Sequence, residues 1–257
     1  MRSAALLCAL AVTLLGCSNE LRSPDGTSQP APGSPEIAID EGSTNQQSSH
    51  STIPRAEGPQ LPPVDQAPSD PTFMDYRRDL LATVMRHDAH QLESFLASDI
   101  RLGFGPRDHG LEMFRQRWNP STPASPLWSV LQDVITHGGV FEQTPDGRRR
   151  FWAPYWFKTF PPAYDGFQYG VITEGGVPLF NAADPQSKIV ATLDHNIVRI
   201  VNGTPTATDG KEWIGIGIPD GANGFVRDRY VRQPVGYRAA FEKRNGSWKM
   251  VLLVSGD

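Results

Sequence analysis

Residues 237–254 read YRAAFEKRNGSWKMVLLV, and this stretch decides much of the fold. Apolar and polar side chains alternate on both sides of Asn245-Gly246, as they do in strands that are buried on one face. An Asn-Gly pair between two alternating runs is the strongest short-range signal of a β-hairpin. The sequence therefore predicts an antiparallel pair of strands over 237–242 and 248–254.

Helix signals dominate the earlier stretch 71–140. Polar residues that can cap a helix stand directly before proline or before apolar residues at helical spacing. A glycine pair at 138–139 predicts the end of the last of these helices. The predicted helix starts are Asp70-Pro71, Asp88 with its capping partner Gln91, Gly110, and Ser125-Pro126.

Helices followed by hairpins are typical of the α+β class. The sequence predicts N-terminal helices with an antiparallel sheet over 71–168, completed by residues 233–257. This order of helices, strand and closing hairpin resembles the cystatin-like cone of nuclear-transport-factor-like proteins. A hairpin is also predicted around Pro145-Asp146-Gly147. The run Arg148-Arg149-Arg150 that follows is interpreted as a solvated hairpin edge rather than a binding patch.

Residues 169–232 contain short strand-like runs separated by Gly, Asp and Pro turns, which suits a small β-barrel. The region resembles a bacterial SH3 domain, and the resemblance implies a small SH3-type β-barrel. The cystatin-like resemblance implies that this barrel is inserted into the first domain, and the alternative is a helical N-terminal domain followed by an elaborated barrel. Two positions depart from the family: the first loop lacks its usual arginine, and Phe225 stands where a tryptophan is usual. The matching segments are 177–181 (VPLFN), Asp184-Pro185, 189–193 (IVATL), 197–201, Trp213-Ile214, Asp220-Gly221, 224–226 (GFV) and Tyr230-Val231.

The N-terminal residues 1–17, MRSAALLCALAVTLLGC, predict a signal peptide. The apolar run 4–15 is shorter than the ~20 residues of a membrane span. It ends in Leu-Leu-Gly-Cys, which resembles the bacterial lipobox and implies lipid attachment at Cys17. Ser18 then implies an outer-membrane lipoprotein. We expect its domain to face the periplasm, and the alternative is exposure at the cell surface. The alternative is an ordinary secretory signal in which Cys17 is incidental.

Residues 18–70 are predicted to be a disordered tether. They are rich in Pro, Ser, Gln, Gly and acidic residues, and all 6 Trp, 6 Tyr and 12 Phe lie after Pro71. A segment without aromatic side chains buries too little apolar surface to offset the entropy of ordering. As a flexible coil it would reach about 40 Å. The only cysteines are Cys8 and Cys17, so a thiol nucleophile and a disulfide are both excluded from the predicted domain.

Aromatic residues supply the candidate ligand-binding positions. In the barrel region, Trp213, Phe225 and Tyr230 are predicted either to line a groove for an extended ligand or to fill the core. In the stretch 151–157 (FWAPYWF), Trp152 and Tyr155 are candidates for stacking on sugar rings. Core packing is the favoured interpretation of that second pair.

Residues with recognisable catalytic chemistry are few. The sequence has no Gly-x-Ser-x-Gly elbow, no Gly-Lys-Ser/Thr phosphate loop and no His-Glu-x-x-His helix. His87 and His90 have metal-like spacing, but no full ligand set accompanies them. We therefore predict no catalytic residue, no metal and no cofactor. Basic and acidic side chains nearly balance over 71–257, which argues against a nucleic-acid partner.

The favoured hypothesis is a membrane-anchored envelope lipoprotein with a non-catalytic binding module for peptidoglycan or an envelope protein. A tether makes weak binding effective by raising the local concentration. The alternative is a small-ligand carrier or acid–base enzyme that uses a pocket in the cone, with Asp108 and His109 as candidates. A deep polar cavity would favour the alternative, and a filled cone would favour a binding or structural protein.

Overall fold

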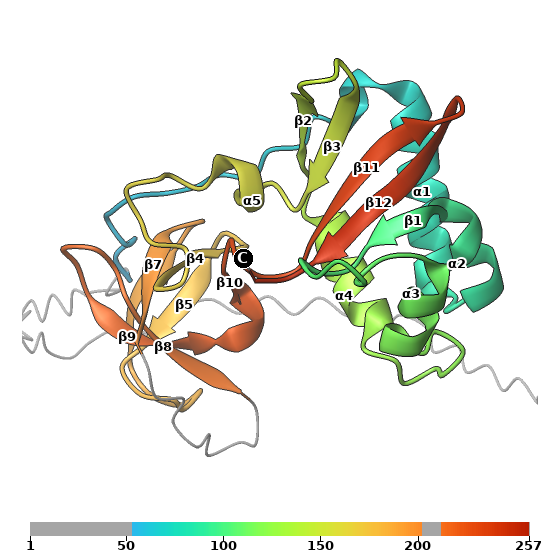
Figure 1. Cartoon of the computed structure of the whole chain (residues 1–257). Coiled ribbons are helices and arrows are strands. Elements are labelled where there is room, and N and C mark those ends of the chain that lie inside the picture. The colour runs from blue at the N-terminus through green and yellow to red at the C-terminus, as the bar shows by residue number, and fades with distance from the viewer. Residues whose placement is uncertain (1–52, 202–211, 257) are drawn as a thin grey trace, which may run out of the picture. The chain divides into compact units, whose positions relative to one another are not determined.

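The computed structural model describes residues 53–201 and 212–256, which lie within one compact unit, His50–Asp257. Cys17, the predicted signal peptide and the predicted tether before residue 53 lie outside the described residues. The described part combines two β-sheets with several helices, so the fold is α+β as predicted (Figure 1). No helix in this part is long and apolar enough to cross a membrane.

The first sheet contains the predicted hairpin at Asn245-Gly246. Both of these residues have positive φ angles, 52° and 82°, as a tight two-residue hairpin turn requires. The strand order is β1-β12-β11-β3-β2. The strands are β1 (Leu96–Arg101), β2 (Val140–Gln143), β3 (Arg149–Ala153), β11 (Arg238–Arg244) and β12 (Ser247–Val254).

One pairing in this sheet corrects the prediction of a purely antiparallel sheet. β1 pairs with β12 in parallel, whereas the other pairs are antiparallel. The two parallel strands are far apart in the chain, so no hairpin turn in the sequence signals their pairing.

Four helices lie against the first sheet (Figure 1). They are α1 (Pro71–Met85), α2 (Ala89–Phe95), α3 (Leu111–Trp118) and α4 (Leu127–Thr136). The Asp70 carboxylate accepts hydrogen bonds from the backbone N–H groups of Thr72 (3.0 Å) and Phe73 (3.2 Å) and so caps α1. Asp88 caps α2 in the same way, through the N–H of Gln91 at 2.9 Å.

Aromatic rings fill the space between α1 and the first sheet. Phe73 from α1 is fully buried and has its ring centroid 4.3 Å from that of Phe151, 4.9 Å from that of Trp248 and 5.6 Å from that of Phe241. Phe141 packs edge-on against Phe73 and Phe151. The space between α1 and the first sheet is therefore a packed core and not a polar cavity.

The second sheet has seven strands, and all of its pairings are antiparallel. Its strand order is β10-β4-β7-β8-β9-β5-β6, and a separate apolar core lies on its inner face. All of its strands lie between β3 and β11 in the chain, so the first sheet is completed only after the second. The strands are β4 (Tyr169–Ile172), β5 (Val177–Phe180), β6 (Ile189–Leu193), β7 (Ile197–Val201), β8 (Trp213–Gly217), β9 (Asn223–Arg227) and β10 (Val231–Arg232).

Residues 53–70, here called the strap, were predicted to belong to the disordered tether, and this prediction was wrong. The strap joins the edge of the second sheet, where Ala56 N–H donates to the Thr192 carbonyl at 2.8 Å. It then reaches the first sheet, where Gln66 N–H donates to the Gly139 carbonyl, also at 2.8 Å. Without aromatic residues of its own, the strap is ordered by backbone hydrogen bonds to the sheet edges and by burial of its Leu61 and Ala67 side chains.

Tyr155 holds the middle of the strap. Its hydroxyl, in a side chain that is only 1% exposed, donates to the Leu61 carbonyl at 2.9 Å. We expect Tyr155→Phe to lower the free energy of unfolding by about 1 kcal/mol, the usual net contribution of one hydrogen bond. Urea unfolding at pH 7 measures this loss, and an unchanged midpoint would contradict it.

The same variant has a distinct pH dependence. Burial raises the pKa of Tyr155 from 10.0 to about 12. The folded state therefore favours the neutral phenol, and the resulting stability is lost as the pH rises from about 10 to about 12. We expect Tyr155→Phe to lose less stability over this window than the unmodified protein, although half-buried Tyr76, whose pKa is also raised, still contributes to the loss in both.

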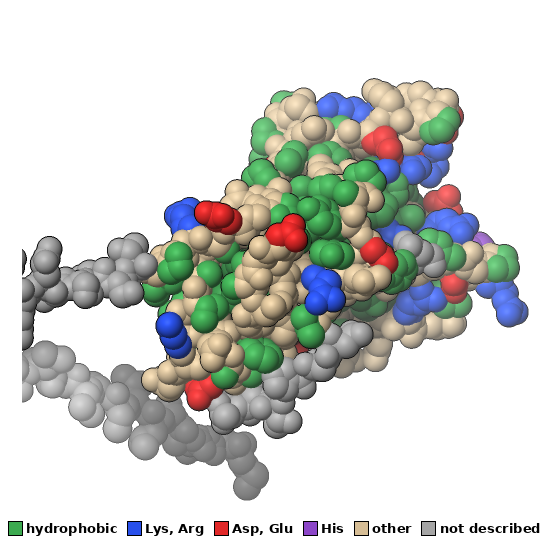
Figure 2. Space-filling view, turned by 90° about the vertical axis from the view of Figure 1, so that its left-hand side faces the viewer, with side chains coloured by type: hydrophobic (Ala, Val, Ile, Leu, Met, Phe, Trp, Pro, Cys, Tyr) green, Lys and Arg blue, Asp and Glu red, His purple; other side chains and the backbone are tan. Residues whose placement is uncertain are grey.

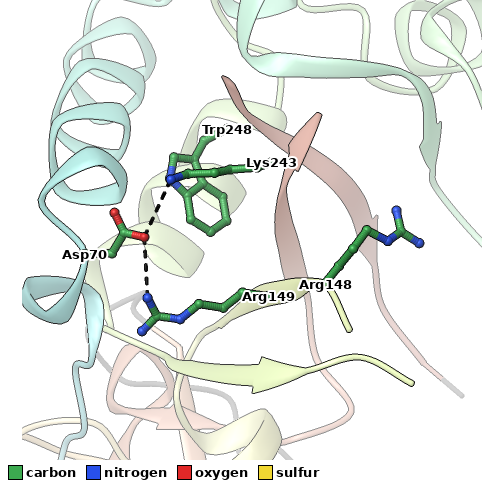
Figure 3. A pocket seen from close by; sticks show the side chains of 5 residues that line it. All are labelled: Asp70, Arg148, Arg149, Lys243 and Trp248. Atoms are coloured by element: carbon green, nitrogen blue, oxygen red, sulfur yellow. Dashed lines mark hydrogen bonds and ion pairs between the residues drawn. The ribbon is translucent and has the colours of Figure 1, made fainter. Parts of the chain in front are cut away.

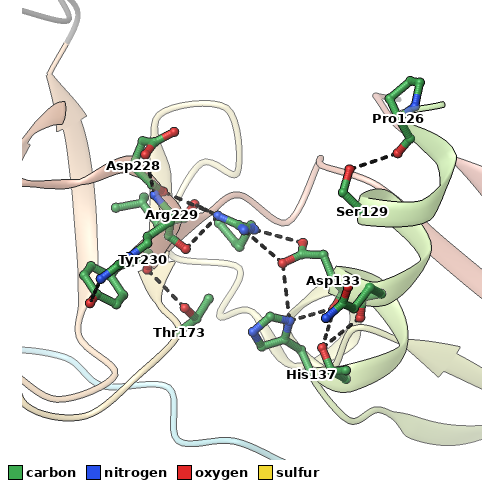
Figure 4. Close-up of polar contacts among 12 residues, drawn as sticks. Pro126, Ser129, Asp133, His137, Thr173, Asp228, Arg229 and Tyr230 are labelled. Atoms are coloured by element: carbon green, nitrogen blue, oxygen red, sulfur yellow. Dashed lines mark hydrogen bonds and ion pairs between the residues drawn. The ribbon is translucent and has the colours of Figure 1, made fainter. Parts of the chain in front are cut away.

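An ion pair connects the second sheet to α4 (Figure 4). Two guanidinium nitrogens of Arg232, in β10, donate to the two carboxylate oxygens of Asp133, each at 2.9 Å. His137 directly follows α4 as its C-cap, with its Nδ1 3.6 Å from an Asp133 carboxylate oxygen. Bidentate arginine–carboxylate pairs are geometrically demanding, so this contact defines how β10 meets α4.

Candidate functional site

A groove lies on the outer face of the second sheet, across β7, β8 and β9. Its volume is about 460 Å³. The pairing register places Val201 opposite Gly215 and Gly215 opposite Phe225, so all three lie on one face of the sheet. The lining residues are Asn181, Arg199, Val201, Gly215, Ile216, Asn223, Gly224 and Phe225.

Gly215 in β8 forms part of the floor of this groove. A Cβ atom at Gly215 would lie 3.5 Å from the Phe225 ring and 3.7 Å from the Cβ of Val201, which are ordinary contact distances. At Gly217, by contrast, a Cβ would come within 2.4 Å of the Asn223 side-chain oxygen. Gly215 therefore leaves space that a small side chain could occupy without strain, and Asn223 already covers Gly217.

The groove walls combine three kinds of chemistry. Phe225 is half-buried and presents part of an aromatic ring, and Val201, which is 40% exposed, adds an aliphatic surface. Arg199 supplies a cation, and Asn181 and Asn223 supply amide donors and acceptors. A ligand with an apolar face, hydroxyl or amide groups and a carboxylate matches this combination.

Of Trp213, Phe225 and Tyr230, which were predicted to bind ligand, only Phe225 lines the groove. Trp213 is fully buried, with the ring of Phe180 edge-on at 5.2 Å and the Arg227 guanidinium 3.9 Å from its ring centroid. Tyr230 packs against the inner core, and its hydroxyl accepts a hydrogen bond from Arg229. The proposed row of three aromatic residues is thus not a continuous surface.

Trp152 and Tyr155 are structural residues. The Trp152 indole N–H donates to Glu142 at 2.7 Å, and Lys158 pairs with the same carboxylate at 2.8 Å while lying 4.9 Å from the Trp152 ring. Trp152 is 7% exposed, and Tyr155 is bonded to the strap. Neither ring presents a face on which a sugar could stack.

The residues considered for acid–base or metal chemistry do not form a site. The Asp108 carboxylate pairs with Arg117 at 2.9 Å and accepts a hydrogen bond from Gly105 N–H, while His109 is exposed. His87 stacks on Trp128 at 4.9 Å and His90 is exposed. Among residues 53–201 and 212–256, no group of three His, Cys, Asp or Glu residues could hold a metal ion.

The sequence reasoning missed most of the groove, namely Arg199, Val201 and the two asparagines. These residues come from three segments, β7, β9 and the residue after β5, which are brought together only by the strand register. One signal was available: Gly215 and Gly217 alternate in the run WIGIG, which places two missing side chains on one face of a strand.

The surface around the second sheet is not dominated by charge of one sign. Figure 2 shows hydrophobic side chains on this side of the molecule, with acidic and basic side chains scattered among them.

Comparison with known proteins adds no relative: no protein-family model, no curated protein and no solved structure matches the chain.

Proposed function

We propose that this protein is an envelope lipoprotein, anchored through Cys17, whose second sheet is an SH3-like, non-catalytic binding module for peptidoglycan. The observation that carries the proposal is the groove over Gly215, with Phe225 on one wall and Val201 and Arg199 on the other. Sugar rings offer apolar faces and hydroxyl groups, and the peptide stems of the cell wall offer amides and carboxylates. The groove supplies a partner for each of these groups.

The packing of the first sheet favours this proposal over a carrier or an acid–base enzyme. Phe73, Phe151, Phe241 and Trp248 occupy the place where a cone would hold a ligand. Asp108, on the loop before α3, is held in an ion pair with Arg117 of that helix. An envelope protein remains the second kind of ligand that the groove could accept, and the experiment below separates the two.

The test is sedimentation of the full chain, in mild detergent, with isolated peptidoglycan sacculi at physiological salt. We expect saturable binding that Phe225→Ala weakens about tenfold, as for a central aromatic contact. Gly215→Ala should also weaken binding, because its methyl group enters the groove floor. Its free energy of unfolding should stay within about 1 kcal/mol of the original value or increase, because glycine is unfavourable inside a strand.

Phe167→Ala is the matched control, because Phe167 is 60% exposed and lies before β4, outside the groove. It should bind sacculi as the unmodified protein does. If the folded protein does not sediment with sacculi, the peptidoglycan proposal is wrong and a protein ligand becomes the explanation for the groove. If Phe225→Ala binds sacculi unchanged, peptidoglycan binds elsewhere.

A further inference from the structure

A small pocket lies at the end of the first sheet where the hairpins β2–β3 and β11–β12 turn (Figure 3). Its volume is about 250 Å³. The pocket is lined by Asp70, Arg148, Arg149, Lys243 and Trp248. It is on a different sheet from the groove over Gly215 and shares no residue with it.

Cations outnumber acids around this pocket. β3 and β11 pair with Arg150 opposite Glu242, so the run Arg148-Arg149-Arg150 lies beside Lys243 and Arg244. Like charges on neighbouring strands destabilise a sheet unless an anion lies between them. On the outer face, that anion is Glu242, which pairs with Arg148 at 2.9 Å.

Among the residues that the structure describes, Asp70 is the only acid lining the pocket, and it contacts two cations at long distances. The Arg149 guanidinium is 3.5 Å from an Asp70 oxygen and the Lys243 ammonium is 3.9 Å from it. Close charge-assisted hydrogen bonds are about 2.7–2.9 Å long. Another Arg149 nitrogen donates to the Ser69 hydroxyl at 2.9 Å, but the guanidinium has further N–H groups, so Arg149 and Lys243 both retain donor capacity toward the pocket, which carries a surplus of positive charge.

Asp70 itself is ionised and occupied. Burial alone would raise its pKa, but hydrogen bonds from the Thr72 side chain and from the N–H groups of Phe73 and Thr72, with the charge of Lys243, together hold that pKa below its usual range. As the cap of α1, it already accepts bonds from Thr72 and Phe73. It is not free to turn fully toward either cation.

Two aromatic rings lie against the cations of the pocket, and one of these rings, Trp248, also forms a wall of the pocket. The Arg149 guanidinium lies 3.6 Å from the centroid of the Phe141 ring, and Lys243 lies 5.4 Å from the Trp248 ring. The Trp248 indole N–H donates to the Thr72 hydroxyl at 3.0 Å, which fixes the orientation of the ring. Donors held in place before binding lose little entropy when a ligand arrives.

We propose that this pocket binds the oxyanion of a small organic ligand, a carboxylate or a phosphate, between Arg149 and Lys243. The body of the ligand is apolar or planar and lies against Trp248. The run Arg148-Arg149-Arg150 then does more than solubilise a hairpin edge: Arg149 provides one half of the anion site.

Titration calorimetry of the full chain with phenyl phosphate, benzoate and uncharged benzamide tests this proposal. All three probes carry the same ring, so only the head group differs between them. We expect phenyl phosphate or benzoate to bind and benzamide to bind at least tenfold more weakly, because it cannot form charge-assisted hydrogen bonds. The stronger of the two anions identifies the head group that the pocket prefers.

Lys243→Gln should weaken anion binding about tenfold, and Lys243→Arg should retain it. Lys188→Gln is the matched control, because Lys188 is an exposed lysine beside β6 in the second sheet. Circular dichroism checks that each variant is folded. Equal binding of benzamide and the anions, no binding of either anion, or anion binding unchanged in Lys243→Gln would each overturn the proposal.

Discussion

Replacing Trp213 with alanine is expected to lower the free energy of unfolding by about 3–5 kcal/mol, the cost of removing a large buried aromatic side chain. Trp213 is fully buried, with Phe180 packed edge-on and the Arg227 guanidinium over its ring. The truncation would leave a cavity at the start of β8 and remove the ring beneath a cation. Chemical denaturation, followed by circular dichroism, measures the loss.

Trp213→Phe is the control that separates packing from the indole itself. The Trp213 indole N–H has no hydrogen-bond partner in the described part of the chain, and a buried unpaired donor costs about 1–3 kcal/mol. Phenylalanine keeps most of the ring volume and removes that donor, so the variant should lose much less stability than alanine does. Equal losses in the two variants would show that the ring packing does not carry the effect.

Glu242→Gln is expected to lower the free energy of unfolding by about 3 kcal/mol. The Glu242 side chain is completely buried on the outer face of the first sheet, where Arg148 and Arg150 lie at 2.9 Å and 2.6 Å and Arg244 at 3.2 Å. Glutamine preserves the shape of the glutamate side chain but removes its negative charge, which leaves the three guanidinium groups close together without a counter-charge. Breaking a buried ion pair costs 3–5 kcal/mol, and the lower value applies because these arginines keep partial contact with water.

Glu112→Gln provides the comparison for an exposed acid. Glu112 is 73% exposed and pairs with Arg115 at 3.4 Å, so its replacement should change stability by less than about 0.5 kcal/mol. A second test is Arg244→Leu in the Glu242→Gln background, which should recover stability by removing one of the uncompensated charges. A loss below about 1 kcal/mol for Glu242→Gln alone would mean that solvent, not Glu242, balances these arginines.

Local signals in the sequence predicted the elements whose causes are local. Asp70 and Asp88 cap the helices that they were predicted to cap, and Asn245-Gly246 forms its hairpin, because capping and tight turns depend on residues within a few positions. The parallel pairing of β1 with β12 depends on two strands about 150 residues apart, and no local pattern encodes it.

The strap and the groove could not be fully predicted from the sequence either, because both depend on contacts between distant segments. Residues 53–70 have the composition of a disordered segment, yet backbone hydrogen bonds to two sheet edges, which do not depend on side-chain type, and two buried apolar side chains, Leu61 and Ala67, order them. Phe225 could be predicted as a binding residue because it is aromatic. Arg199 and Asn223 could not, because only the register of β7, β8 and β9 places them beside it.

The strap also decides how the domain would respond to mechanical tension. If the chain is anchored through Cys17, a pulling force enters the described part at residue 53, where the strap pairs with Thr192 at the edge of β6. The Arg55–Asp194 ion pair and the backbone bonds to Thr192 would bear the load before it reaches Leu61, and the start of α1 would bear it last. Detachment of the first strap residues would thus lengthen the tether while both sheets stay folded.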